Sequence, residues 1–141
     1  MTQEEKDLLL KDLCARLPYG VKVKVKYYDD NWRLLAIYTN STTYVTRDIG
    51  YPIETYFEDC KPYLFPLSSM TKEQLFEVQE ILGKNEIKID DGFLRIVDSD
   101  RNVITYLEIL AVLEWFYKNH FDINDLIPKD LAIDATGLNI Y

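Results

Sequence analysis

The sequence contains few of the residues from which metal centres and catalytic triads are built. It has two cysteines, Cys14 and Cys60, and a single histidine, His120. A structural zinc site needs four such ligands, and a nucleophile such as Ser68, Ser69 or Cys60 would have to use His120 as its base. The sequence therefore does not favour the zinc-dependent or triad-based mechanisms of most familiar hydrolases. We expect neither a cofactor nor a metal.

Long apolar runs and a leader-like segment are also lacking. A membrane helix needs roughly 20 apolar residues, and the longest apolar run is interrupted by Glu108, Glu114 and Lys118. Residues 1–20 mix charged residues with leucines and do not have the order of a signal peptide. We expect a cytoplasmic protein with reduced thiols and no contact with a membrane.

Positive charge is scarce over most of the chain. The 16 basic and 24 acidic residues give a formal net charge of -8. Residues 21–47 hold five bases against two acids, whereas residues 48–141 hold eight bases against eighteen acids. Because nucleic-acid binding gains much of its affinity from neutralised phosphates, an acidic chain is a poor generic binder of nucleic acid. An acidic surface instead suits a partner whose own surface is basic.

Hydrophobic spacing in the first half of the chain predicts one helix and an antiparallel meander. Residues 2–17 carry leucines at helical spacing, and Thr2 with Glu5 has the spacing of a capping box at the helix start. Residues 21–27 alternate strictly, which predicts a strand with three valines and Tyr27 on one face and three lysines on the other. Two further strands are expected to complete the meander, over residues 32–38 and 42–47.

The second half of the chain predicts a loop, two helices and a hairpin. Residues 49–70 contain three prolines, so we expect a tyrosine-rich loop with at most one short strand. Helices are expected over residues 71–83 and 103–119, and the Asp91–Gly92 pair predicts a turn between two short strands. The expected fold class is α+β, a single domain over residues 1–141 in which the two later helices pack on the sheet.

The expected helix over residues 103–119 is apolar on nearly every side. Such a helix is either buried in the core or covered by a partner. In the first case, alanine at Leu110 or Leu113 should lower the free energy of unfolding by about 2–5 kcal/mol. His120 follows this helix directly, and a histidine there can bond the last carbonyls and is favoured by the helix dipole. We therefore expect His120 to act as a cap.

Pairs of acidic residues recur in the expected turns and support an enzymatic alternative. Two carboxylates that converge on one point could carry acid-base chemistry or hold a metal ion. The triplet Glu86-Ile87-Lys88, with Asp48 or Asp59 upstream, has the pattern of a metal-dependent nuclease. Acids are common in turns for conformational reasons, and a Glu-x-Lys triplet arises readily by chance. We therefore expect no enzymatic activity.

Tyrosine is over-used, with 11 residues against 6 phenylalanines. Tyrosine is enriched at interfaces because its apolar body and polar tip suit half-wet surfaces. We expect a partner-binding surface that joins tyrosines of the middle segment with nearby acids: Tyr51, Tyr56, Glu58, Asp59, Tyr63, Asp90 and Asp91. Three lysines of the first strand are expected to form a solvated face, and in an alternative interpretation they bind nucleic acid: Lys22, Lys24 and Lys26.

Three motifs lie near the two ends and in the middle of the chain. Residues 12–22 read DLCARLPYGVK, residues 61–71 read KPYLFPLSSMT, and residues 120–129 read HFDINDLIPK. Together they resemble a family of small uncharacterised proteins that is widespread in Bacteroidetes bacteria, their phages and mobile elements. The chain departs from that pattern at Phe65, where arginine is expected, and at the IND triplet, where Tyr-Arg-Gly is expected. The resemblance implies no catalytic residues.

These observations favour a non-enzymatic protein that binds another protein. The resemblance implies a phage or mobile-element inhibitor of a host defence system, for example an anti-CRISPR protein whose acidic surface occupies a basic nucleic-acid channel. The expected partner is a host protein with a basic surface, such as a CRISPR effector, and nucleic acid is not expected as a direct ligand. Two alternatives remain: a metal-dependent nuclease or hydrolase with paired carboxylates, and a small RNA-binding module that uses the lysine strand.

Overall fold

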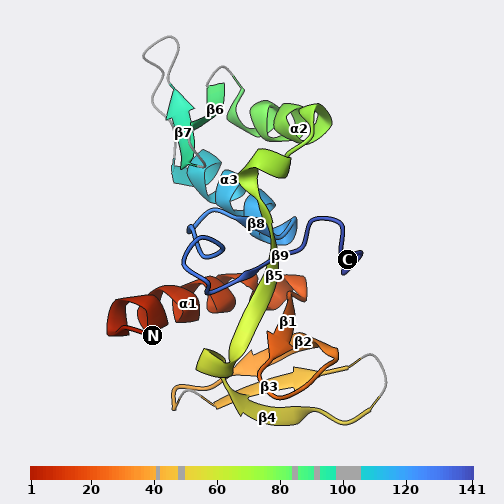
Figure 1. The fold of residues 1–141 in the computed structure, drawn as a ribbon. Helices are drawn as coiled ribbons and strands as arrows, with labels where there is room; N and C mark the ends of the chain where they lie inside the picture. The colour runs from red at the N-terminus through yellow and green to blue at the C-terminus, as the bar shows by residue number, and fades with distance from the viewer. Residues whose placement is uncertain (41, 48–49, 84–85, 91–92, 98–105) are drawn as a thin grey trace.

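The structure is a computed structural model with a mixed α+β fold (Figure 1). It describes six ranges of the chain: residues 1–40, 42–47, 50–83, 86–90, 93–97 and 106–141. An N-terminal helix, a mostly antiparallel sheet and two later helices confirm the expected fold class. Within these ranges, no helix has the length and apolar character that crossing a membrane requires.

The N-terminal helix α1 spans Gln3–Arg16 and begins at the expected capping box. The Thr2 hydroxyl accepts a hydrogen bond from the Glu5 amide at 3.2 Å, and the Glu5 carboxylate accepts one from the Thr2 amide at 2.7 Å. Leu9 and Leu13 are buried in a core that also contains the inward-facing residues of the sheet. The capping box and the leucine spacing therefore define this helix as predicted.

The main sheet has the strand order β4-β3-β2-β1-β5-β8, and β9 also pairs with β5. Its strands are β1 (Lys22–Val25), β2 (Asn31–Ile37), β3 (Thr42–Thr46), β4 (Ile53–Tyr56), β5 (Cys60–Pro66), β8 (Phe121–Asp122) and β9 (Ile133–Asp134). Strands β1 to β4 form an antiparallel meander, whereas β8 and β9 run parallel to β5. The predicted meander is confirmed.

Tyr27 does not continue the alternation of β1. The strand ends at Val25, and the Tyr28 amide donates to the Val25 carbonyl at 3.1 Å, which closes a turn. Tyr27 has a φ of 69° and is 86% exposed. The prediction that Tyr27 shares the buried face of the valines is wrong, because the chain turns two residues before the alternation ends.

Strand β5 occupies a segment for which the prolines predicted a loop. The Lys26 amide donates to the Asp59 carbonyl at 2.9 Å. Because hydrogen-bonded pairs alternate along antiparallel strands, Pro62, which lies opposite Val23, falls between the ladder bonds to β1 and needs no amide hydrogen there. The loop prediction is wrong for this reason, and β5 instead connects the two ends of the molecule (Figure 1).

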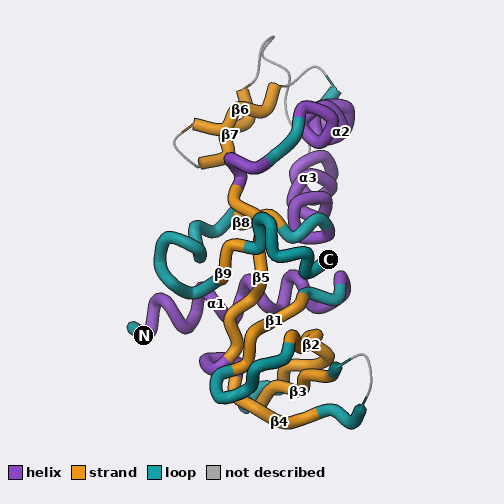
Figure 2. Tube along the Cα trace, turned by 45° about the vertical axis from the view of Figure 1, so that its right-hand side comes forward, coloured by secondary structure: helices purple, strands orange, loops and turns teal. Residues whose placement is uncertain are grey.

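Helices α2 (Lys72–Leu82) and α3 (Tyr106–Lys118) lie with the hairpin β6 (Glu86–Asp90) and β7 (Phe93–Val97) at the β8 end of β5 (Figure 2). Helix α2 begins at a second capping box, Thr71 with Gln74, and ends at Gly83 as predicted. Six buried residues form a second core here: Leu67, Val78, Leu82, Val112, Phe116 and Phe121. The two later helices therefore pack around the end of β5 and do not cover the meander.

The predicted hairpin strands are present, and the turn at Asp91–Gly92 lies outside the described residues. Helix α3 has two unlike faces, since Val112 and Phe116 are buried while Leu107 and Leu110 are 75% and 42% exposed. The expected large cost of alanine at Leu110 does not fit this exposure, because an exposed leucine leaves no cavity. The assignment of residues 1–141 to a single domain stays a prediction.

Candidate functional site

The meander has one packed face and one open face. Helix α1 covers the packed face, where Val23, Leu34 and Val45 are buried. The open face carries the side chains that alternate with these residues, and it divides into an aromatic half and a basic half. The residues of each half come from separate strands, and the strand register places their side chains on one surface of the sheet.

The aromatic half consists of Tyr38, Tyr44 and Tyr56, and we call it the tyrosine face. Tyr56 lies opposite Thr42, which shares a side of β3 with Tyr44. The rings of Tyr38 and Tyr44 meet edge to face, with centroids 5.5 Å apart. Tyr38 and Tyr56 are 57% and 58% exposed, so the tyrosine face is open to solvent.

A β-bulge places Tyr38 on this face. Strict alternation from Trp32 and Leu34 would send Ala36 and Tyr38 to the packed side of the sheet. The register between β2 and β3 shifts by one residue between Leu34 and Ala36, so that Ala36 lies opposite Tyr44 and Ile37 turns inward. The bulge therefore completes the aromatic surface.

Glu54 adds one acidic group to the tyrosine face. The Tyr44 hydroxyl donates to the Glu54 carboxylate at 3.2 Å, and the negative charge of Glu54 together with this hydrogen bond raises the pKa of Tyr44. Both side chains border a hollow of about 320 Å³, which is also lined by Tyr38 and Thr42. The hollow offers aromatic walls with a single carboxylate at its edge.

The basic half of the open face consists of Lys22, Lys24, Arg33 and Lys61. Lys22 lies opposite Arg33, and Lys24 lies opposite Lys61, so all four side chains share one side of the sheet. Lys61 is ion-paired with Asp130 at 2.6 Å. In the described part of the chain, Lys22 and Arg33 form no ion pair. Lys22 and Lys24 are half-buried on this side of the sheet, and Lys26 is exposed beyond the end of β1.

The predicted partner-binding tyrosines have different environments. Tyr51 and Tyr56 are 91% and 58% exposed, but Tyr63 is buried on β5 and contributes to packing rather than to the surface. Asp90 ends strand β6, which lies at the opposite end of the molecule from β4 (Figure 1). Asp91 lies outside the described residues. The predicted residues thus do not form one continuous surface.

Glu58 and Asp59 lie in a short 3-10 helix, Phe57–Asp59, between β4 and β5. Glu58 is ion-paired with Lys6 of α1 at 2.8 Å. A hollow of about 300 Å³ is lined by both acids and three lysines: Glu58, Asp59, Lys24, Lys26 and Lys61. The structure therefore brings the predicted acidic patch and the predicted lysine strand together, and the local charge is mixed.

Within the described ranges, no group of three or more His, Cys, Asp or Glu side chains could hold a metal ion. Asp122 instead accepts hydrogen bonds from two backbone amides, at 2.9 and 2.8 Å. The Glu-x-Lys triplet lies on β6, whereas Asp59 lies at the other end of the molecule. Asp48 lies outside the described residues. The predicted nuclease set with Asp59 is thus not assembled.

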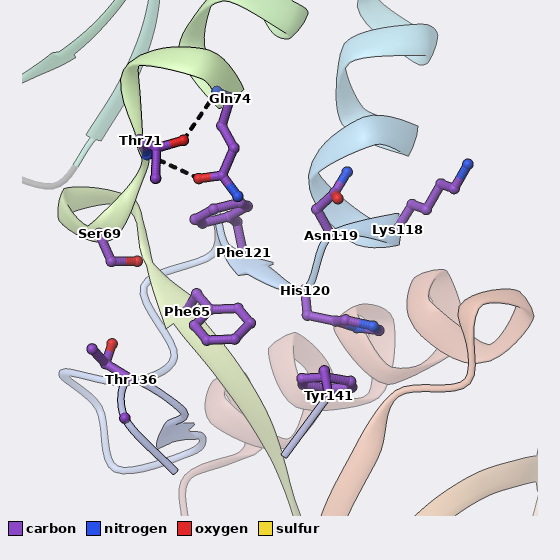
Figure 3. Close-up of a pocket in the computed structure, with 11 residues that line it drawn as sticks. Phe65, Ser69, Thr71, Gln74, Lys118, Asn119, His120, Phe121, Thr136 and Tyr141 are labelled. Carbon is purple, nitrogen blue, oxygen red and sulfur yellow. Dashed lines mark hydrogen bonds between the residues drawn. The ribbon is translucent and has the colours of Figure 1, made fainter. Parts of the chain in front are cut away.

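A pocket of about 400 Å³ lies where β5, α2, α3 and the last residues of the chain meet (Figure 3). His120 follows α3 with a φ of 61°, and its ring stacks on the ring of Tyr141 with centroids 3.8 Å apart. The expected cap by the His120 side chain is replaced by two other hydrogen bonds. The His120 backbone amide donates to the Tyr117 carbonyl, and the Asn119 side-chain amide donates to the Trp115 carbonyl. The His120 Nδ1 atom is buried without a partner.

His120 and Ser69 line the same pocket, yet they do not form a base and nucleophile pair. The Ser69 hydroxyl donates to the Pro66 carbonyl at 2.7 Å, and the Phe65 ring lies between the two side chains in Figure 3. Burial raises the pKa of the Cys60 thiol to about 12, which keeps it protonated at neutral pH. Ser69 and Cys60 thus lack the geometry or the ionisation that nucleophilic catalysis needs.

Tyr141 bridges two strands at the point where they separate. Its hydroxyl accepts a hydrogen bond from the Lys22 amide at 3.0 Å and donates one to the Tyr63 carbonyl at 2.9 Å. Lys22 and Tyr63 would form the next hydrogen-bonded pair of β1 and β5, so the hydroxyl takes the place of a ladder bond. Burial raises the pKa of Tyr141 to about 12. Nothing in the sequence pattern indicated this role.

Burial, followed by the charge of Arg16, lowers the pKa of His120 from 6.5 to about 4. The unfolded chain therefore binds a proton more readily than the folded one, and His120 should cost stability as the pH falls from 6.5 towards 4. We expect a loss of about 1–3 kcal/mol, allowing for partial solvent screening. Urea unfolding at both pH values should show a smaller loss for His120→Phe, which retains the stack on Tyr141. An equal loss in both proteins would contradict this assignment.

No family model, curated protein or solved structure matches this chain. The resemblance of its motifs to the Bacteroidetes family therefore stays a hypothesis, and the functional interpretation depends on the residues themselves.

Proposed function

We propose that this chain is a non-enzymatic cytoplasmic protein that binds another protein through its tyrosine face. The observation that carries this proposal is the exposure of Tyr38 and Tyr56, at 57% and 58%, on a sheet face that α1 does not cover. Tyrosine gives a large contact area at low cost in side-chain entropy, and aromatic anchors often dominate binding energy. Three neighbouring tyrosines on an open sheet fit such an anchor cluster.

The charge of the chain favours a partner with a basic surface. The net charge is -8, and Glu54 lies within the tyrosine face. Long-range attraction would speed encounter with a basic surface, and the tyrosines would then supply contact energy. The motif resemblance supports a narrower proposal, in which the partner is a component of a bacterial defence system such as a CRISPR effector and the chain occupies its nucleic-acid channel.

The test is affinity purification of tagged protein from a Bacteroidetes host, followed by quantification of any stoichiometric partner. We expect the double change Tyr38→Ser and Tyr56→Ser to reduce recovery of the partner by about tenfold or more, the loss typical of interface hot spots. Phe76→Ser is the matched control, because Phe76 is a 63% exposed aromatic residue on α2, away from the sheet. Equal recovery with all three proteins would refute the tyrosine face as the contact surface.

A second candidate function is binding of single-stranded RNA, and one observation favours it. Lys22, Lys24 and Arg33 share the open face with the tyrosines, which combines phosphate contacts with rings on which bases can stack. In this case, Lys22→Glu with Lys24→Glu should abolish binding to a fluorescent oligonucleotide, and added salt should weaken binding of the unmodified protein. Without saturable binding at low salt, this candidate fails and the protein-binding proposal stands alone.

A further inference from the structure

The hollow of about 320 Å³ beside Tyr44 has the composition of a site for a cation. Six of the described residues line it, and we call it the Glu54 hollow: Tyr38, Thr39, Asn40, Thr42, Tyr44 and Glu54. None of these six is basic, and the carboxylate of Glu54 is the charged group among them. Among the residues that the structure describes, no lysine or arginine is ion-paired with Glu54. The hollow therefore presents a negative charge that its own surroundings leave unneutralised.

The Glu54 carboxylate is held in place at the edge of the hollow. Tyr44 lies opposite Glu54 in the pairing of β3 with β4, and its hydroxyl donates to Glu54 Oε2 at 3.2 Å. This hydrogen bond uses one of about four acceptor positions that the two oxygens of an ionised carboxylate offer. The other acceptor positions are best filled by N–H donors that carry a positive charge. A cation with N–H groups therefore suits this carboxylate better than a quaternary ammonium group, which has no donor.

Two tyrosine rings supply the aromatic wall of the hollow. The rings of Tyr38 and Tyr44 have centroids 5.5 Å apart and an angle of 74° between their planes. In such an edge-to-face pair, the ring that contributes its edge keeps both of its faces free of the other ring. The face of a tyrosine ring is negative and attracts a cation. Because Tyr38 is 57% exposed, a side chain of another protein can reach this wall from solvent.

Aromatic and acidic groups side by side favour arginine over lysine. A guanidinium group is flat, so its face can stack on a tyrosine ring while the N–H groups along its edge donate to a carboxylate. A lysine ammonium is a compact point charge without a face to stack. A volume of about 320 Å³ is at the lower end of the range for small-molecule sites, which suits one long side chain.

We propose that the Glu54 hollow binds an arginine side chain of the partner protein, with the guanidinium against the Tyr38 and Tyr44 rings and its N–H groups donating to Glu54. The inference rests on the proposed function, because it names the chemical group through which a basic partner meets the tyrosine face. The net charge of -8 supports it, since a negative chain attracts a positively charged surface before contact.

The test uses Nα-acetyl-arginine amide as the probe at low salt, with backbone amide shifts recorded by NMR to locate it. We expect saturable shifts in β3, in β4 and around Tyr38. Glu54→Gln is the decisive variant, since glutamine retains an oxygen for the Tyr44 hydroxyl and removes only the charge. We expect it to weaken probe binding by about threefold to tenfold, because an exposed charge pair contributes less than a buried one. Tyr38→Leu should weaken binding in the same direction, because it removes one ring.

Glu4→Gln is the matched control, because it removes the same charge from an exposed carboxylate on α1, which covers the other face of the sheet. We expect this control to bind the probe as the unmodified protein does. Nα-acetyl-citrulline amide, which has the shape of the probe without its charge, and Nα-acetyl-lysine amide should both bind more weakly. The arginine site is overturned if the probe shows no saturable binding, if the shifted amides lie elsewhere, or if Glu54→Gln or either analogue leaves binding unchanged.

Recovery of the partner separates this inference from the proposed function. In affinity purification from the host, Glu54→Gln should reduce recovery of the partner by about threefold or more. The proposed function fails alone if the Tyr38→Ser and Tyr56→Ser protein recovers the partner fully while the arginine probe binds at the hollow. The arginine site fails alone if that double variant loses the partner while Glu54→Gln recovers it fully.

Discussion

Replacing Asp12 by asparagine should lower the free energy of unfolding by about 3–5 kcal/mol, because it leaves the Arg16 guanidinium buried without a counter-charge. Both side chains of this pair are 0% exposed. Arg16 donates to the two Asp12 carboxylate oxygens at 2.6 and 3.0 Å and to the Phe121 carbonyl at 2.7 Å. The pair thus ties α1 to β8, at the junction of the two cores.

Urea unfolding measures this loss, and the chain offers a matched control. Asp125 and Lys129 form an ion pair with the same i,i+4 spacing, but their side chains are 40% and 39% exposed. Asp125→Asn should therefore cost less than about 1 kcal/mol. The double change Asp12→Leu with Arg16→Met should recover much of the loss, because it removes both buried charges. A loss below about 1 kcal/mol for Asp12→Asn would show that the pair is hydrated and not buried.

Replacing Phe116 by alanine should lower the free energy of unfolding by about 3–5 kcal/mol. Phe116 is 0% exposed in the second core, and its ring meets those of Trp115 and Phe121 edge to face. The same change at Leu110, which is 42% exposed on the same helix, should cost less than about 1 kcal/mol. Comparable losses from Phe116→Ala and Leu110→Ala in urea would contradict the orientation of α3.

Local signals predicted the elements that local interactions define. The two capping boxes, at Thr2 and Thr71, lie where the spacing of a hydroxyl residue and its Glu or Gln partner indicated. The alternation of valine and lysine predicted β1, although its last pair belongs to a turn. These features depend on residues within a few positions of one another, so the sequence contains what is needed to predict them.

Features that depend on distant partners escaped prediction. Whether Pro62 breaks a strand depends on its register against Val23, and no local pattern specifies that register. The pair Asp12 and Arg16 has the spacing of an ordinary surface ion pair, and it is buried by residues distant in the sequence, among them Tyr117 and Phe121. Without knowledge of that register, the prolines of residues 49–70 predicted a loop where the structure has β5, the strand that connects the two cores.

The candidate surface was predicted in part. Tyr56 is exposed as expected, but Tyr63 is buried, and Tyr38 and Tyr44 were not among the predicted contact residues. The β-bulge between Leu34 and Ala36 moves Tyr38 to the open face, and it is visible only once β2 and β3 are paired. The number of tyrosines in the composition indicated an interface, whereas the register of the strands determines which tyrosines lie together on one face.

The central claim is that a protein partner contacts the tyrosine face, and site-specific photo-crosslinking tests it most directly. A benzophenone amino acid placed at Tyr56 samples this face, and the same group at Phe76 samples an equally exposed aromatic position on α2. Our account predicts a single crosslinked protein from position 56 in living cells and none from position 76. A crosslink to the same protein from position 76 and not from position 56 would contradict it.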